Sequence, residues 1–277
     1  MRAAAVQLQS TTDTEQNLAS AERHVRAAAA DGAELVVLPE RLDIRGAAAD
    51  YRAAAEPLDG RPVNWARELA RELGIDLVAG SVAERRDGRE RVSNTSVHVG
   101  PDGEIRAVYR KIHMFDVEVG GVEYRESEHS EPADELVLSE TANGVSLGLT
   151  ICYDLRFPEL YRILALRGAR VITVPANFTR VTGEAHWEVL LRARAIENQV
   201  FVIAPGQGRR SGPEGDSYGN SMIVDPWGEV LARAGAEGAC FVAAELDLAH
   251  QDEVREKLPS LANRVAGAYQ WPEEARA

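Results

Sequence analysis

One of the two cysteines, Cys152, stands where an apolar run gives way to polar residues, and this position suits a nucleophile. The apolar residues 147–151 predict a buried strand that ends at the cysteine. Pro158 follows and suits the first turn of a helix. A thiol at the carboxyl end of a strand, facing a helix N-terminus, is favoured as a thiolate, and N–H groups there can hold an oxyanion.

The alternative is that Cys152 only packs, because free cysteines are among the most buried residue types. Cys240 fits that interpretation, since it lies in the uniformly apolar segment 238–244. A nucleophilic Cys152 would also need a base and a group that stabilises the developing oxyanion.

Two charged residues also stand at the ends of apolar strands. Glu40 follows residues 36–39, and a carboxylate beside a buried sheet could have a raised pKa and serve as a proton shuttle. Lys111 follows residues 108–110 and could be a rigid cation near a sheet end. For each, the alternative is an exposed side chain in a loop.

The elements that must position these residues alternate between strands and helices. Apolar residues recur at helical spacing in some segments and form short runs in others, while turn residues at 100–103 and 225–228 mark two hairpins. The expected strands are 3–8, 34–38, 76–82, 92–99, 105–109, 145–151, 171–175 and 200–204. The expected helices are 15–30, 63–73, 158–167 and 186–198.

This order predicts an α/β fold with mixed sheets covered by helices. The second half of the chain repeats the scheme of the first, which indicates an internal two-fold repeat within one domain. The predicted domain covers residues 1–258, and residues 259–277, which lose periodicity, are expected to form a C-terminal tail.

Composition and charge argue against several classes of function. The net charge of −13 makes nucleic acid or an anionic membrane surface an unfavourable partner. No apolar segment is long enough to span a membrane, and the N-terminus becomes polar too soon for a signal peptide. The two cysteines lie in unlike settings, which argues against a disulfide. We therefore expect a cytoplasmic location. No His-x-x-x-His, Cys-x-x-Cys or glycine-rich nucleotide motif occurs, so we expect no metal and no cofactor.

Three ordered segments around the candidate residues resemble the Glu–Lys–Cys signatures of the nitrilase superfamily, the carbon–nitrogen hydrolases. They are Leu38-Pro39-Glu40, Tyr109-Arg110-Lys111-Ile112-His113-Met114-Phe115-Asp116 and Ile151-Cys152-Tyr153-Asp154-Leu155-Arg156-Phe157-Pro158-Glu159. Further matches lie at 182–188, 192–199 and 225–228, and the likeness runs from Ala3 to about Pro259. Within the superfamily the chain is most similar to the Nit branch, which contains omega-amidase and deaminated glutathione amidase.

The resemblance implies an α-β-β-α four-layer sandwich and a thiol amidase that cuts a small linear amide to a carboxylate and ammonia. Cys152 would attack the amide carbonyl, and Glu40 would take the thiol proton and later pass it to ammonia. Lys111 and the backbone N–H of Tyr153 would stabilise the oxyanion. Water activated by Glu40 would then hydrolyse the thioester.

The family carries a second glutamate, and Glu126 is its best match in this chain. Glu123 and Glu128 lie nearby, and the loop 117–122 is about one residue shorter than the family pattern, so the three glutamates remain alternatives.

The substrate is less closely defined than the chemistry. Arg156 could pair with a substrate carboxylate, or it could form an ion pair with Asp154 or Glu159 that stabilises its loop. The loop 43–51 is rich in alanine and departs from omega-amidase-like sequences. Three residues after the expected strand 171–175 would line the pocket: Asn177, Phe178 and Thr179.

Other activities stay open within and beyond this chemistry. The alternatives are a nitrilase, an N-carbamoyl amide hydrolase, or a catalytically idle scaffold that binds a partner. The resemblance also implies a homodimer or larger homo-oligomer, and the expected helices 158–167 and 186–198 carry apolar residues on more than one face.

Overall fold

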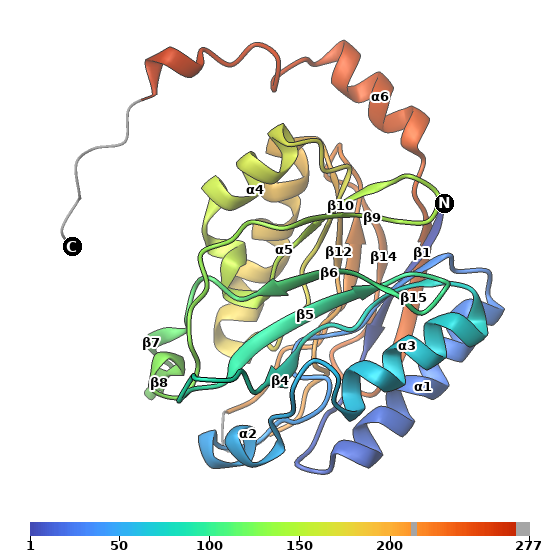
Figure 1. Cartoon of the computed structure of the whole chain (residues 1–277). Coiled ribbons are helices and arrows are strands. Elements are labelled where there is room, and N and C mark those ends of the chain that lie inside the picture. The colour runs from blue at the N-terminus through green and yellow to red at the C-terminus, as the bar shows by residue number, and fades with distance from the viewer. Residues whose placement is uncertain (212–214, 270–277) are drawn as a thin grey trace.

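Two β-sheets stack face to face between two layers of helices in the computed structural model, which describes residues 1–211 and 215–269 (Figure 1). The first sheet contains β1 (Arg2–Gln7), β2 (Leu35–Val37), β3 (Asp76–Val78), β4 (Val82–Glu84), β5 (Ser93–Val99), β6 (Ile105–Arg110) and β15 (Cys240–Glu245). The second contains β9 (Leu138–Glu140), β10 (Ser146–Leu149), β11 (Val171–Thr173), β12 (Phe201–Ala204), β13 (Met222–Val224) and β14 (Val230–Arg233). The predicted four-layer sandwich is confirmed.

The strand orders of the two sheets correspond to one another. The first sheet runs β15-β1-β2-β3-β5-β4, with β6 paired to β5, and the second runs β14-β13-β12-β11-β10-β9. In each sheet three strands are parallel, β1 with β2 and β3, and β10 with β11 and β12. This correspondence is the internal repeat expected from the sequence.

The helices are α1 (Thr14–Ala30), α2 (Ala48–Ala54), α3 (Arg61–Leu73), α4 (Pro158–Leu166), α5 (Arg180–Asn198) and α6 (Leu248–Lys257), with the short 3-10 helices η1 (Glu126–Glu128), η2 (Cys152–Arg156) and η3 (Ala266–Ala268). Of these, α1, α3, α4 and α5 cover the outer faces of the sheets, whereas α6 extends beyond them (Figure 1). Alternation along β1 shows the layering, because Ala3 and Ala5 face the second sheet while Ala4 and Val6 pack with α1 and α3. On the other side, α4 and α5 pack on the second sheet.

Local sequence signals explain several helix boundaries. The Asp13 side chain accepts a hydrogen bond from the Gln16 N–H at the start of α1, and Gly74, at φ +65°, ends α3. Thr179 caps α5 in the same way, so this helix begins at Arg180, earlier than the predicted 186.

The predicted strand 76–82 was wrong in one respect, because it is two strands, β3 and β4, separated at Gly80. Gly80 has φ +46°, and a Cβ atom there would collide with the carbonyl oxygen of Pro39. The glycine therefore lets this turn lie against the backbone that leads to Glu40.

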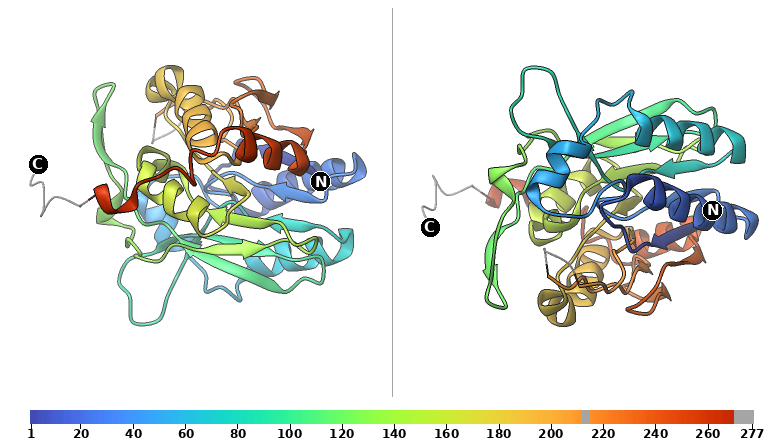
Figure 2. Two further views of the ribbon diagram at one scale, coloured as in Figure 1. Left: turned by 90° about the horizontal axis from the view of Figure 1, so that it is seen from above. Right: turned by 90° about the horizontal axis from the view of Figure 1, so that it is seen from below.

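Two expected loops contain regular structure. The loop 43–51 includes the start of α2, whose alanine-rich sequence has no amphipathic pattern to signal a helix. The loop 117–122 lies within a two-stranded ribbon of β7 (Asp116–Val119) and β8 (Val122–Arg125), which turns at Gly120-Gly121. The ribbon stands at the edge of the sandwich, apart from both sheets (Figure 2).

Of the predicted tail 259–277, residues 259–269 are mostly exposed, and residues 270–277 lie outside the described residues. Among the helices described, none combines the length and apolar character needed to cross a membrane.

Candidate active site

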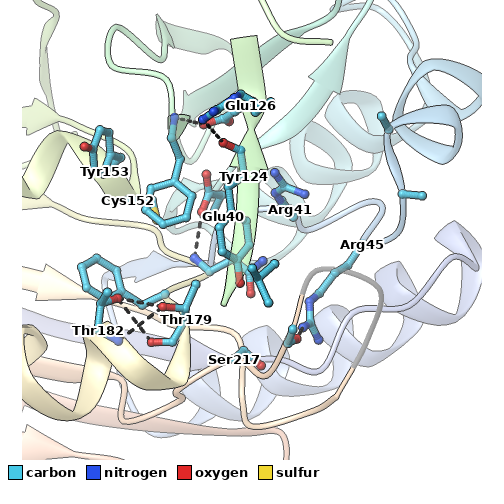
Figure 3. Close-up of a pocket in the computed structure, with 18 of the residues that line it drawn as sticks. Glu40, Arg41, Arg45, Tyr124, Glu126, Cys152, Tyr153, Thr179, Thr182 and Ser217 are labelled. Carbon is cyan, nitrogen blue, oxygen red and sulfur yellow. Dashed lines mark hydrogen bonds between the residues drawn. The ribbon is translucent and has the colours of Figure 1, made fainter. Parts of the chain in front are cut away.

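Four chemically reactive side chains line one cavity where strands of both sheets and of the β7–β8 ribbon end. Figure 3 shows three of them, Glu40, Glu126 and Cys152. Glu40 follows β2, Lys111 follows β6, Glu126 follows β8 and Cys152 follows β10. All four are buried, with exposed fractions between 2% and 7%. Because buried charges are costly unless they are paired, their mutual contacts decide what the site can do.

Lys111 joins the two glutamates. Its Nζ atom lies 3.1 Å from Glu40 Oε1 and 2.7 Å from Glu126 Oε2. Glu123 and Glu128 are exposed, so Glu126 is the member of this group of glutamates that contacts the lysine.

Neutral donors also form hydrogen bonds with the carboxylate oxygens of Glu40 and Glu126. Asn94 Nδ2 donates to Glu40 Oε1 at 2.9 Å and to Glu126 Oε1 at 3.3 Å. The backbone N–H of Asn177 donates to Glu40 Oε2 at 2.8 Å, and that of Phe115 donates to Glu126 Oε2 at 2.8 Å. Both carboxylates are therefore held in fixed orientations. Asn94 was not predicted from the sequence, although it lies in a run of polar residues within the strand β5.

The electrostatics of the site favour a charged lysine and a neutral thiol, in contrast to the thiolate expected from the position of Cys152 in the sequence. Burial alone would lower the pKa of Lys111, but the charges of Glu126 and Glu40 outweigh burial and raise it. Burial alone would raise the pKa of Glu126, but Lys111 and Arg41 lower it. Burial and the adjacent Glu40 carboxylate raise the pKa of the Cys152 thiol well above its ordinary value, against the opposing effect of Lys111. The thiol therefore needs a base in order to become a nucleophile, and Glu40 is beside it.

The backbone at Cys152 is unusual. Its φ of +46° lies in the left-handed region, which is strained for a residue with a side chain. The predicted helix start at Pro158 is confirmed, and the residues between it and the nucleophile form the short 3-10 helix η2, which was not predicted. Within the described residues, the N–H of Tyr153 donates no hydrogen bond to a protein acceptor, so it remains available to a ligand in the cavity.

The reactive groups lie in a cavity of about 230 Å³. Tyr153 lines it, and so do the three residues predicted after the strand: Asn177, Phe178 and Thr179. Figure 3 shows Tyr153, Thr179 and Thr182 on one side of Cys152 and Glu40, with Arg41 and Arg45 on the other. The cavity is large enough for a small molecule only.

Arginines are distributed differently from expectation. Arg156 is not among the described residues that line the cavity; its guanidinium lies 5.4 Å from the Phe178 ring centroid and 3.3 Å from His186 Nδ1. Arg41, Arg45 and Arg125 do line it. None of these three was predicted from the sequence, although Arg41 directly follows Glu40.

Cys240 lies apart from this site. It is half-buried in β15, which pairs with β1, and does not line the cavity among the described residues. Among those residues, no group of three or more histidine, cysteine, aspartate and glutamate side chains is arranged to hold a metal ion.

Comparisons with known proteins extend over nearly the whole chain. The family model described as carbon-nitrogen hydrolase matches residues 2–256. Human omega-amidase NIT2 is 38% identical over 97% of this chain and 96% of its own length, and the bovine deaminated glutathione amidase is 41% identical over 96% and 82%. The crystal structure of the C. elegans NitFhit protein superposes with a TM-score of 0.90 at 39% identity, covering 97% of this chain and 66% of that one.

Proposed function

The chain belongs to the carbon–nitrogen hydrolase family, and we propose that it is a thiol amidase acting through a Cys152 thioester. Its substrate is a small linear amide that bears a carboxylate, and its products are the acid and ammonia. The observation that carries this proposal is the buried Glu40–Lys111–Glu126 ion-pair network, which lies in one small cavity with Cys152.

The first half of the reaction forms the thioester. Cys152 Sγ attacks the amide carbonyl carbon while Glu40 takes the thiol proton. The charge on the carbonyl oxygen is stabilised by the Lys111 ammonium and the Tyr153 N–H. The carbon–nitrogen bond then breaks, and the proton held by Glu40 passes to the leaving nitrogen, which departs as ammonia.

The second half regenerates the enzyme. Glu40 removes a proton from water, the resulting hydroxide attacks the thioester carbonyl, and the same donors stabilise the second oxyanion. The carbon–sulfur bond breaks, the acid leaves, and the proton on Glu40 returns to the Cys152 thiolate. The raised pKa of Cys152 supports this scheme, because a neutral resting thiol requires such a base.

Glu126 holds the lysine in place for both steps. With its second carboxylate partner, Lys111 stays protonated, and its Nζ atom is fixed between two anchored carboxylates. Glu126 is a positioning residue in this scheme, since Lys111 Nζ and the backbone N–H of Phe115 both lie against its carboxylate.

The cationic wall of the cavity supports an acid-bearing substrate. Arg41, Arg45 and Arg125 could receive a carboxylate at the end of the substrate away from the amide. Arg156, stacked near Tyr153 and Phe178, is the alternative partner. Two relatives are named as amidases, omega-amidase and deaminated glutathione amidase, which supports an amide over a nitrile.

We further propose that the chain forms a homodimer or larger assembly through α4 and α5. Ile163 and Leu166 on α4 are 37% and 46% exposed, and Val189 on α5 is 67% exposed. Light scattering on wild type and Val189→Glu tests this assembly, and we expect a smaller molar mass for the variant.

A cytoplasmic location stays a prediction.

Ammonia release tests the activity directly. The panel comprises glutaramate- and succinamate-type acids, deaminated glutathione, a carbamoyl amino acid and a simple nitrile, with wild type, Cys152→Ala and the matched control Cys240→Ala. Turnover of an acid-bearing amide that is lost only in Cys152→Ala supports the proposal. Turnover confined to the nitrile or the carbamoyl compound would replace it with that activity, and none at all would favour the idle scaffold.

A further inference from the structure

A further buried carboxylate, that of Asp154, lies two residues beyond the nucleophile and is fully shielded from solvent. Its Oδ2 atom accepts a hydrogen bond from the Tyr109 hydroxyl at 2.6 Å and from the Ile151 N–H at 2.8 Å. Its Oδ1 atom lies 2.8 Å from His113 Nδ1 and accepts a longer bond from the His113 N–H at 3.3 Å. Each oxygen therefore binds two donors.

The donors connect two parts of the site that come from different sheets. Tyr109 and His113 stand two residues before and two residues after Lys111, on and just beyond β6 of the first sheet. Ile151 directly precedes Cys152, after β10 of the second sheet. Asp154 is thus hydrogen-bonded to residues that precede and follow Lys111 in the sequence, and to the residue before Cys152.

The two side chains that contact Asp154, those of Tyr109 and His113, are held rigidly. Burial and the neighbouring Asp154 charge raise the pKa of Tyr109, so its phenol stays protonated and remains a donor. The imidazole of His113 stacks on the Phe157 ring with centroids 3.5 Å apart and planes 6° apart. The carboxylate is therefore held by groups that have little freedom of their own.

The turn that carries the nucleophile needs such support. A non-glycine residue at φ +46° persists only where surrounding contacts over-determine its backbone. The Cys152 N–H donates to the Pro175 carbonyl at 2.8 Å, which fixes one side, and the Ile151–Asp154 bond fixes the other.

We propose that Asp154 is a positioning residue that sets the placement of the Cys152 thiol relative to the Lys111 ammonium. This inference rests on the proposed function, because it concerns the same reacting groups and adds no new step. A misplacement of about 1 Å between reacting groups can cost about 10²-fold in rate, which is the scale expected on removing the carboxylate.

A purely structural role is the alternative, and the chain supplies a matched control for it. Asp76 is also buried, lies 3.1 Å from His98 Nε2 through Oδ1, and accepts the Ala142 N–H at 3.0 Å through Oδ2. It stands at the amino end of β3, whereas the site lies beyond the carboxyl ends of β2 and β10. Asp76→Asn therefore perturbs a similar cluster away from the site.

The experiment compares wild type, Asp154→Asn, Asp76→Asn and Tyr109→Phe. The first readout is the rate of iodoacetamide alkylation at Cys152 as a function of pH, located by peptide mass. The second is kcat and KM for the best amide, at a temperature at which each variant is folded by circular dichroism. We expect Asp154→Asn to lower kcat about 10²-fold with KM within about threefold, and to change the pH profile of alkylation.

Asp76→Asn should lower thermal stability yet leave the profile and kcat close to wild type. Tyr109→Phe removes one hydrogen bond, should lower kcat about tenfold, and decides the question if Asp154→Asn does not fold. Equal effects from Asp76→Asn, or wild-type alkylation and kcat in the Asp154 and Tyr109 variants, would overturn the inference. If wild type hydrolyses no amide, the proposed function fails, whereas the alkylation comparison still tests the positioning role.

Discussion

Lys111 and Glu126 form a buried ion pair, with 2.7 Å between Nζ and Oε2, beside the longer contact of Lys111 with Glu40. Because Glu126 lies closer to Lys111, Glu40 is not the only carboxylate that balances the charge of the lysine. Glu40 is then available to accept a proton, although it lies in the same network.

Replacing Glu126 by glutamine should impair catalysis more than binding. The variant keeps an acceptor for Lys111 but removes the charge, so Glu40 becomes the lysine's only carboxylate partner in the network and a poorer base. We expect kcat to fall about 10²-fold with little change in KM. Steady-state kinetics on Glu126→Gln and the exposed neighbour Glu128→Gln provide the comparison. Equal activity in the two variants would show that the second glutamate has been misassigned.

Asn94 should matter because it bonds to both glutamates. Asn94→Ala would release one anchor of each carboxylate, and we expect kcat to fall about tenfold or more while the protein stays folded. The measurement is kcat together with the thermal midpoint. A kcat within twofold of wild type would mean that backbone donors alone orient the carboxylates.

The cavity arginines should determine the preference for acids. Arg41→Gln or Arg45→Gln should raise KM for an acid-bearing amide about tenfold or more, and should leave a matched neutral amide unaffected. Arg156→Gln serves as the comparison, since its guanidinium stands outside the described lining. If Arg156→Gln alone raises KM for the acid, the carboxylate binds on the side of Tyr153 and Phe178 instead.

Asp43 should make stability depend on pH. Burial raises its pKa to about 7 from an ordinary 3.8, and its Oδ1 atom has no hydrogen-bond partner among the described residues. Between these two pKa values the folded state retains a proton that the unfolded state has released, so stability falls as pH rises through this range. Above it the charged, buried carboxylate costs stability.

Asp43→Asn removes that penalty and keeps an acceptor for the Ala83 N–H. We expect the variant to be more stable than wild type by about 2–4 kcal/mol at pH 8 and nearly equal to it at pH 4. Urea unfolding at the two pH values measures the difference. A variant less stable than wild type at pH 8 would mean that Asp43 is ionised and well solvated in the folded state.

The sequence predicted the parts of this molecule that depend on local pattern. Alternating apolar strands and glycine-closed helices indicated an α/β fold with mixed sheets, and the resemblance to the nitrilase superfamily implied the four-layer sandwich. The strand-end positions of Glu40, Lys111 and Cys152 indicated chemistry before any contact was known. Residues whose position depends on tertiary packing were not predicted. Asn94 has the sequence pattern of an ordinary strand residue. Arg41 lines the cavity and has a backbone φ of +61°, a conformation that an arginine in the sequence does not indicate.

Other misses have equally physical causes. The 3-10 helix η2, which precedes the correctly predicted helix start at Pro158, begins at a left-handed backbone that the residue type of Cys152 does not signal. The ribbon of β7 and β8 joins neither sheet, so sheet-wide alternation does not reveal it.

The proposed function depends on an acyl group that forms on Cys152, and mass spectrometry of an acid-quenched reaction detects such a group. With the best amide of the panel, we expect the peptide containing Cys152 to gain the mass of the substrate less ammonia. Cys240 should gain nothing, and hydroxylamine should remove the adduct. Steady ammonia release without any adduct on Cys152, and undiminished in Cys152→Ala, would show that the reaction does not pass through a Cys152 thioester.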